Sequence, residues 1–377
     1  MSIVLLISIL LVIPFILFYK LIKNHFPSLI NNLLFYIVPK LSKSINKGII
    51  NFKSFNWCNL SLLINNNSII PKSLKDITHP SIVYIKDGWN GYSHWLAATP
   101  YPQTLDSFGA PYENTWIFFS NNNSGLSHPI NFESIQNNPI IQKEEAQYNS
   151  DPNLFFDIVS NKLFCITRKR HGPGFVTNIV LQSSKDGLTW SAPKSIITIN
   201  TAEQFLSPCL IKFSSKYRIY AFQTEPTDTS KSTSIDIWES ESLENPNFIF
   251  LKSIKWREPM NIWHGGLFEY GNKLYLIFCG SHNNYKYITG QRDISKYLFL
   301  GYSDDGENFN TYNNPILKMN GVYRSSAFVD ENNNLVCYVS LHNRYRGEKL
   351  YASGNRIGMF VYLFDKLISE LSTKANY

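Results

Sequence analysis

The chain reads His79-Pro80-Ser81-Ile82-Val83-Tyr84 where a polar residue leads directly into a short apolar strand. Four later stretches repeat this arrangement. They occupy residues 151–156, 207–211, 264–268 and 324–329. Successive starts lie about 60 residues apart, which is close to the length of one four-stranded propeller blade with long loops. The repeat therefore predicts an all-β chain that forms a five-bladed β-propeller.

The chain after each start indicates a hairpin and further strands of the same blade. Turn residues such as Gly271 and Asn272 separate the first apolar strand from the second, as a tight hairpin requires. The fifth repeat leaves little chain for an outer strand before the C-terminus. We therefore expect residues 59–70 to supply that strand, because an open ring would leave an unpaired edge.

Two turns carry a further repeated pattern. Residues 184–190 read Ser-Lys-Asp-Gly-Leu-Thr-Trp, and residues 303–309 read Ser-Asp-Asp-Gly-Glu-Asn-Phe. Both are similar to the Asp-box turns of sialidase-like propellers. In such a turn the aspartate accepts backbone N–H groups while the aromatic side chain packs beneath, so we interpret both turns as structural.

The bulk composition fits a large folded domain and argues against several other classes. Hydrophobic residues make up 44% and aromatic residues 15% of the 377 positions, which is enough for an extensive core. The formal net charge of +7 is spread among acidic residues, so we expect no nucleic-acid partner. None of the five cysteines belongs to a CxxC pair, which favours buried, reduced thiols. We expect a monomer.

The N-terminus differs in kind from the rest of the chain. Residues 1–19 contain no charged side chain and are long enough to cross a hydrocarbon core, which predicts a transmembrane helix within residues 1–23. Residues 24–75 are interpreted as a membrane-proximal stalk, residues 76–365 as the propeller and residues 366–377 as a C-terminal tail.

Lysines follow the predicted anchor and suggest its orientation. They are Lys20, Lys23, Lys40, Lys43 and Lys47. By the positive-inside rule, this arrangement predicts a single-pass membrane protein with a cytoplasmic C-terminal domain. A luminal or extracellular domain is the alternative, because some signal anchors break this simple count.

Propeller geometry brings two kinds of loop to one end of the ring. The loop that enters each innermost strand and the loop that leaves the second strand open on the same side, so their residues face one funnel. The entering loops contribute His79, Asp151, Ser207, Trp263, His264 and Arg324. The leaving loops contribute Tyr101, Arg168, Glu225 and His342, and Glu113 opens the third strand of the first blade. The sequence thus predicts a polar, aromatic and charged funnel.

This region resembles the five-bladed propeller glycosidases of the arabinanase and levansucrase type, in glycoside hydrolase families 43 and 32. The resemblance covers about residues 76–365 and rests on His79-Pro80 with residues 88–92, on residues 112–114 and on residues 148–152. It implies a glycan substrate and carboxylates that open blades one, two and three. Only Asp151 matches, at the position that tunes the acid, since His79 and Ser207 occupy the other two positions.

Catalysis in such a funnel needs a second carboxyl group besides Asp151. Glycoside hydrolysis uses one carboxyl group to protonate the leaving oxygen and another to activate water or attack. We therefore assign Asp151 as the orienting or tuning carboxylate, and Glu225 and Glu113 as the candidate acid and base.

The remaining funnel residues are interpreted as substrate-binding. Aromatic rings expected to stack on sugar faces are Trp89, Tyr92, Tyr101 and Trp263. Polar groups expected to bind hydroxyl or anionic groups are His79, His264, His342, Arg168 and Arg324. We expect no cofactor and no metal. A histidine metal site built from His79, His264 and His342 is the alternative.

The leading hypothesis is a membrane-anchored glycoside hydrolase. Two alternatives stay open: a carbohydrate-binding propeller without catalysis, which the two missing carboxylates favour, and a membrane-tethered scaffold that binds a protein partner on its outer rim.

Overall fold

The structure is a computed structural model of the 377-residue chain. It describes residues 48–50, 55–61, 76–101, 113–121, 127–142, 147–171, 176–200, 205–224, 232–255, 260–282, 297–312, 314–319, 321–341 and 356–373. The predicted anchor at residues 1–23 and most of the predicted stalk lie outside these ranges. Within them, no helix is both long and apolar enough to cross a membrane.

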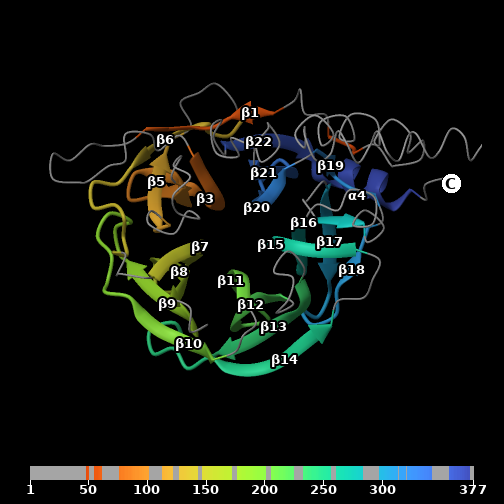
Figure 1. Ribbon diagram of the computed structural model, residues 1–377. Coiled ribbons are helices and arrows are strands. Elements are labelled where there is room, and N and C mark those ends of the chain that lie inside the picture. Colours follow the sequence, from red (N-terminus) through yellow and green to blue (C-terminus); the bar gives the residue numbers. More distant parts are fainter. Residues whose placement is uncertain are drawn as a thin grey trace, which may run out of the picture.

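The described strands form a five-bladed propeller (Figure 1), which confirms the predicted fold class. The innermost strands are β3 (Asp76–Trp89), β7 (Gln147–Asp157), β11 (Phe205–Phe213), β15 (Met260–Tyr270) and β20 (Val322–Val329). The second strands are β4 (Tyr92–Tyr101), β8 (Lys162–His171), β12 (Lys216–Thr224), β16 (Lys273–His282) and β21 (Asn334–Leu341). The third strands are β5 (Trp116–Ser120), β9 (Val176–Ser184), β13 (Ser232–Ser240), β17 (Tyr297–Ser303) and β22 (Arg356–Leu363). The outer strands of blades one to four are β6 (Asn131–Ser134), β10 (Lys194–Asn200), β14 (Ile249–Lys255) and the short pair β18 (Asn310–Thr311) and β19 (Leu317–Lys318).

The core lies between the blades. Alternate residues of a strand point to opposite faces of its sheet, so Trp95 packs toward blade two while Leu96 packs toward blade five. The same alternation in the other second strands fills each junction between neighbouring blades with its own apolar cluster. These clusters explain why the strands are rich in Phe, Tyr, Ile and Leu on both faces.

The ring is closed by a segment that precedes the first blade in sequence. The outer strand of blade five is β1 (Asn56–Trp57), which pairs with β22. Just after it, β2 (Asn59–Ser61) runs parallel to β6 of blade one, and just before it Ile50 bridges to Leu317 of blade four. Residues 48–50 and 55–61, which we call the strap, therefore contact the outer edges of three blades, and Figure 1 shows β1 along the edge of β22.

The prediction that a segment before the first blade supplies the outer strand of blade five was confirmed, but the predicted residue range was wrong. The outer strand of blade five is residues 56–57 rather than residues 59–70, and residues 59–61 extend blade one instead. This strand is short because the chain passes from blade five to blade one within a few residues. Only two residues can therefore pair with β22 before the chain pairs with blade one.

The C-terminus is also part of the fold. Helix α4 (Phe364–Ser372) buries Phe364, Leu367 and Leu371 in the cluster between blades four and five. The boundary expected at residue 365 therefore falls inside a packed helix, and the segment interpreted as a tail contributes apolar side chains to the core.

The two Asp-box turns have the predicted structural role. In the first, Asp186 Oδ1 accepts the N–H groups of Leu188 and Thr189 at 2.8 and 2.7 Å. Gly187 has a φ of +77°, and a Cβ there would lie 2.1 Å from the Trp95 ring of blade one. In the second, Tyr220 of blade three donates to the Gly306 carbonyl at 2.8 Å. Each turn therefore fastens its blade to the preceding one.

A buried hydrogen-bonded relay joins the first and last blades. Ser93 Oγ lies 2.8 Å from His94 Nδ1, and His94 Nε2 lies 3.1 Å from His128 Nδ1. His128 Nε2 in turn lies 2.9 Å from Asp330 Oδ2, in the β20–β21 turn. Burial, aided by the neighbouring His128, lowers the pKa of His94 from 6.5 to about 3, so this imidazole is neutral.

Truncation of Phe55, which is 8% exposed and packs 5.4 Å from Phe360, should destabilise the ring closure. We expect Phe55→Ala to lower the free energy of unfolding by about 3 kcal/mol, because it removes a buried aromatic side chain. Urea unfolding of the full chain measures this, with the exposed Ile249→Ala as control. A loss for Phe55→Ala no greater than for the control would contradict the strap's role.

The relay predicts a defined pH dependence of stability. Because the folded pKa of His94 is depressed, its contribution is fully present above the unfolded pKa of 6.5 and is lost as the pH falls below it. Between pH 7 and pH 5 the wild type should lose about 2 kcal/mol more of its free energy of unfolding than His94→Gln does. Denaturant titrations at both pH values test this, and equal losses would refute it.

Candidate functional site

All five innermost strands carry an irregularity at the same level near the axis. Each register shift lies close to the start of its strand and expels one or two residues from the ladder. The residues at these bulges are His79, Asp151, Ser207, Trp263 with His264, and Tyr323 with Arg324. Bulges re-aim side chains, and here they turn five strands' residues toward one point.

Three of the bulge residues also have left-handed backbones. His79, Asp151 and Ser207 have φ values of 54°, 54° and 47°, and each is followed by proline. A non-glycine residue in this region costs about 1–3 kcal/mol, so the surrounding blades must impose the conformation. The same backbone shape at the same level of three blades indicates a shared positional constraint.

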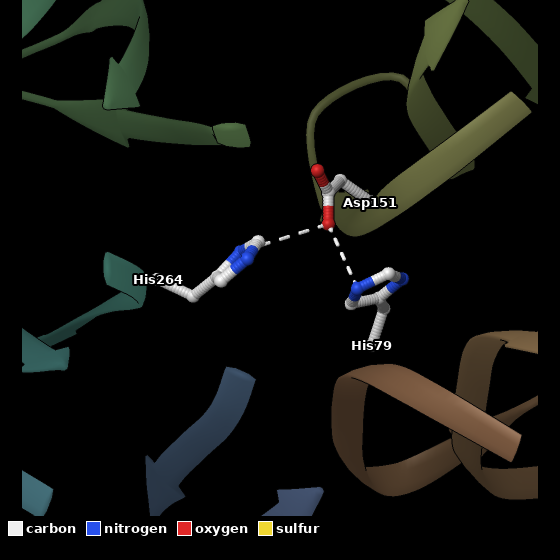
Figure 2. Close-up of side chains that lie close together, drawn as sticks. All are labelled: His79, Asp151 and His264. Carbon is white, nitrogen blue, oxygen red and sulfur yellow. Dashed lines mark ion pairs between the residues drawn. The ribbon is translucent and has the colours of Figure 1, made fainter. Parts of the chain in front are cut away.

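Asp151 is the centre of the cluster (Figure 2). Its Oδ1 atom lies 3.3 Å from His79 Nε2 and 3.8 Å from His264 Nδ1. Its Oδ2 atom accepts the backbone N–H of Ser207 at 3.3 Å. The Ser207 hydroxyl lies 2.7 Å from His264 Nδ1, so one residue orients both the carboxylate and the imidazole.

Two guanidinium groups complete the surroundings of Asp151. Arg168 Nε lies 3.2 Å from Oδ2, and the same side chain donates to Ser150 Oγ and to the Phe205 carbonyl. Arg324 Nη1 lies 3.7 Å from Oδ1, while its Nη2 donates to the Pro208 carbonyl at 3.4 Å. Arg324 Nε and Nη1 have no hydrogen-bond partner among the described residues, although the side chain is only 1% exposed.

The electrostatics fix the protonation state of the carboxylate. Burial by itself raises the pKa of Asp151, but Arg168, His79, His264 and Arg324 outweigh it and hold the pKa well below its usual range. Burial likewise lowers the pKa of His264 well below its ordinary value, and Asp151 opposes this only in part. The site therefore holds an ionised carboxylate beside a neutral imidazole, and Asp151 has no proton to donate.

An aromatic wall borders the cluster on the side of blades four and five. The Tyr323 ring lies 4.3 Å from the His264 ring and 5.1 Å from the His79 ring, and it meets the Trp263 ring edge-on at 4.7 Å. The expected position of Trp263 beside His264 agrees with this arrangement. Tyr323 was not among the sequence candidates. Its signal was its place directly before Arg324, which matches the place of Trp263 before His264.

The candidate acid and base have different outcomes. Glu113 is 5% exposed, and its carbonyl accepts the N–H of Asn149, two residues before Asp151, at 2.7 Å. The backbone of Glu113 therefore lies against β7 two residues before Asp151, and its side chain is buried. Glu225 and His342 lie outside the described residues. Tyr101 ends β4 opposite Asp76, at the same end of the hairpin as His79, and its side chain is outside the described part.

Trp89 and Tyr92 do not join the site, which corrects the expectation that they stack on sugars there. They pair with each other at the closed end of the β3–β4 hairpin, while His79 lies at the other end of β3. Ten residues of extended chain span about 30 Å. Trp89 packs 5.4 Å from Phe156, and Tyr92 packs 4.2 Å from Phe119. Both rings belong to the core between blades one and two.

The cluster also has the composition of a metal site, where the sequence led us to expect no metal. His79, Asp151 and His264 each offer one ligand atom, and these atoms lie within 4.8 Å of one another. His342, a member of the alternative histidine set, is outside the described residues. Among the described residues, the candidate metal ligands are therefore two imidazoles and one carboxylate, where the alternative hypothesis had three imidazoles.

Comparison with known proteins gives the fold but no family. No family model matches the chain, and no curated protein matches it. Among solved structures, an N-acetylgalactosamine deacetylase from F. plautii, in complex with blood group B trisaccharide, matches with a TM-score of 0.67 and 15% identity, over 86% of this chain and 99% of that one.

Two glycosidases match at a lower level. A thermostable family-43 glycoside hydrolase has a TM-score of 0.51 at 13% identity, over 76% of this chain and 88% of that one. The catalytic domain of a GH62 α-L-arabinofuranosidase from Coprinopsis cinerea has a TM-score of 0.53 at 13% identity, over 82% and 97% of the two chains. The chain thus shares the five-bladed fold of these glycosidases, as the sequence resemblance implied.

The charge balance of the cluster predicts unequal effects of two substitutions. Asp151 is a single negative charge against the two guanidinium groups that contact it. Asp151→Asn leaves both cations buried without a counter-ion and should lower the free energy of unfolding by about 3 kcal/mol. Arg324→Met removes one of the two positive charges that face Asp151, so it should lower the free energy of unfolding by much less. Denaturant unfolding in EDTA compares them, and a larger loss for Arg324→Met would overturn this account.

Proposed function

We propose that the protein is a carbohydrate-active hydrolase that binds a glycan at the funnel end of the propeller and reacts it at the Asp151 cluster. The observation that carries the proposal is the convergence of five bulged strands on one buried, charged point. A protein that used only its outer rim would gain nothing from a strained and charged axis, because both features cost stability.

The known proteins support a glycan as the ligand class. The matching structures include a deacetylase that acts on an amino sugar and an arabinofuranosidase, and all share this propeller. A fold alone does not fix an activity. The proposal therefore rests on the cluster, and the matching structures suggest what kind of molecule the funnel takes.

The residues would divide the work according to their protonation states. Asp151 would be an ionised anchor that orients His79, His264 and Arg324, in the orienting or tuning role that the sequence resemblance implies. Glu113 is the described candidate for a general base or acid, since its side chain is buried and its backbone bonds to Asn149, two residues before Asp151. Trp263 and Tyr323 would form the apolar wall on which a sugar face stacks.

Membrane attachment belongs to the proposal as a prediction from sequence. The apolar segment of residues 1–23 would tether the propeller, and the lysines that follow would favour a cytoplasmic domain. The strap, residues 48–50 and 55–61 on the outer edges of blades four, five and one, would then lead from the anchor into the propeller.

The proposal predicts that binding and turnover separate at Glu113. We expect Glu113→Gln to keep glycan binding and to lower turnover by about 10²–10⁴-fold, because a positioned acid or base contributes that much. A glycan array identifies the bound sugar, and product release from it is followed by mass spectrometry. The matched control is Glu133→Gln, which alters an exposed carboxylate on β6.

Two results would contradict this function. Equal turnover in the wild type and Glu113→Gln would remove Glu113 from the chemistry. Tight glycan binding without release by any variant would make the protein a carbohydrate-binding propeller.

A further inference from the structure

We propose that His79, Asp151 and His264 form a binding site for a divalent transition-metal cation, in the first place Zn²⁺, and that the bond hydrolysed there is the acyl amide of an N-acylated sugar. This inference rests on the proposed glycan-directed function and names its metal and its substrate class. The site is built from three blades, with the ligand side chains pointing toward one another in Figure 2.

The geometry of the ligand atoms fits a cation. Zinc binds histidine nitrogen and carboxylate oxygen at about 2.0–2.2 Å, so neighbouring ligand atoms in a tetrahedral site lie roughly 3.3–3.6 Å apart. The contacts from Asp151 Oδ1 to the two imidazoles are 3.3 and 3.8 Å. Three protein ligands leave a position open, which is the pattern of a catalytic rather than a structural zinc site.

A buried carboxylate oxygen that accepts no hydrogen bond from the described residues also supports a cation site. Asp151 is fully buried, and its Oδ1 has no hydrogen-bond partner among the described residues. A buried carboxylate oxygen is costly unless something positive satisfies it. By contrast, Oδ2 is held by Arg168 and by the Ser207 N–H, so the oxygen that faces the imidazoles is the one left for a cation.

The surrounding residues act as outer contacts that orient the ligands. Ser207 Oγ lies 2.7 Å from His264 Nδ1, so this hydroxyl would release Nδ1 when that nitrogen binds the cation, while the Ser207 N–H would continue to hold Asp151 Oδ2. Arg168 fixes the rotation of the carboxylate. A bound cation would polarise a substrate carbonyl and ease deprotonation of water.

The chemistry favours amide hydrolysis over cleavage of a glycosidic bond. Both oxygens of Asp151 face imidazole or guanidinium groups, and among the described residues no second carboxyl group contacts the cluster as a partner for glycosidic cleavage. In amide hydrolysis the water oxygen bonds to the acyl carbon, the C–N bond breaks, and both water protons end on the departing nitrogen. Glu113 would accept the first proton and pass it to that nitrogen, so the products are a carboxylate and the ammonium form of a free amino sugar.

Arg324 would serve as the group that meets negative charge on the substrate. Its Nε and Nη1 lack hydrogen-bond partners among the described residues, and Nη1 lies on the Oδ1 side of Asp151. The carbonyl oxygen of the amide becomes negative in the transition state, where a positioned donor is most effective. The positive charges of Arg168 and Arg324 repel a divalent cation. An anionic oxygen bound to the cation at the coordination position that the protein leaves open would offset this repulsion.

Metal binding is tested first, without reference to activity. The full-length protein is stripped with EDTA, dialysed against ZnCl₂ and assayed for bound metal by mass spectrometry. We expect one Zn²⁺ per chain in the wild type, at least 100-fold weaker binding in His79→Gln and His264→Gln, and wild-type binding in His94→Gln, which alters a buried histidine outside the cluster. Circular dichroism confirms that each variant is folded. No stoichiometric metal in the wild type, or full binding in both ligand variants, would overturn the site.

The substrate class is tested second, with an N-acetylgalactosamine-containing oligosaccharide as the probe. Release of acetate that EDTA abolishes and Zn²⁺ restores supports the inference, and Arg324→Met should lower the rate at least 100-fold with metal content unchanged. Release of reducing sugar without acetate would overturn the substrate class but keep the hydrolase. Glycan binding in a protein that takes up no metal would overturn the metal site and leave the proposed function standing.

Discussion

One buried carboxylate contacts every blade of this ring. Asp151 belongs to blade two and touches His79 of blade one, Ser207 of blade three, His264 of blade four and Arg324 of blade five. Its surroundings keep it ionised although it is fully buried. Because such a charge is tolerated only when it is surrounded by partners, the inner ends of all five blades must stay at fixed distances. The charged cluster at the axis and the closure of the propeller therefore share one constraint.

The stability that supports this costly centre comes from elsewhere. Apolar clusters fill the junctions between blades, and residues 48–50 and 55–61 together with α4 cover the outer edges near blades four, five and one. The Asp-box turns add contacts between neighbouring blades at two turns. This division is physically reasonable, since apolar burial is favourable and tolerant of sequence, whereas the axis contains left-handed residues and excess positive charge that lower stability.

Much of the architecture was predictable because it depends on local pattern. The five innermost strands include the polar-to-apolar starts predicted at His79, Asp151, Ser207, His264 and Arg324, although each strand begins two to four residues earlier. The misplacements have specific causes. Trp89 and Tyr92 share the composition of a sugar-binding surface, but strand direction carries them to the far end of β3. The outer strand of blade five was assigned a few residues late because its partner, β22, lies 300 residues away and leaves no local signal.

The sequence by itself determined the repeat, the existence of the five innermost strands and the polar residue ahead of each apolar run, because hydrophobic alternation and turn chemistry act over a few neighbouring residues. Only the tertiary structure decided that His79, Asp151 and His264 meet at one point, that Ser207 orients two of them, and that Tyr323 forms the wall beside them. These contacts join residues more than 50 positions apart. They depend on the angle between blades and on the bulges, which no short stretch of sequence specifies.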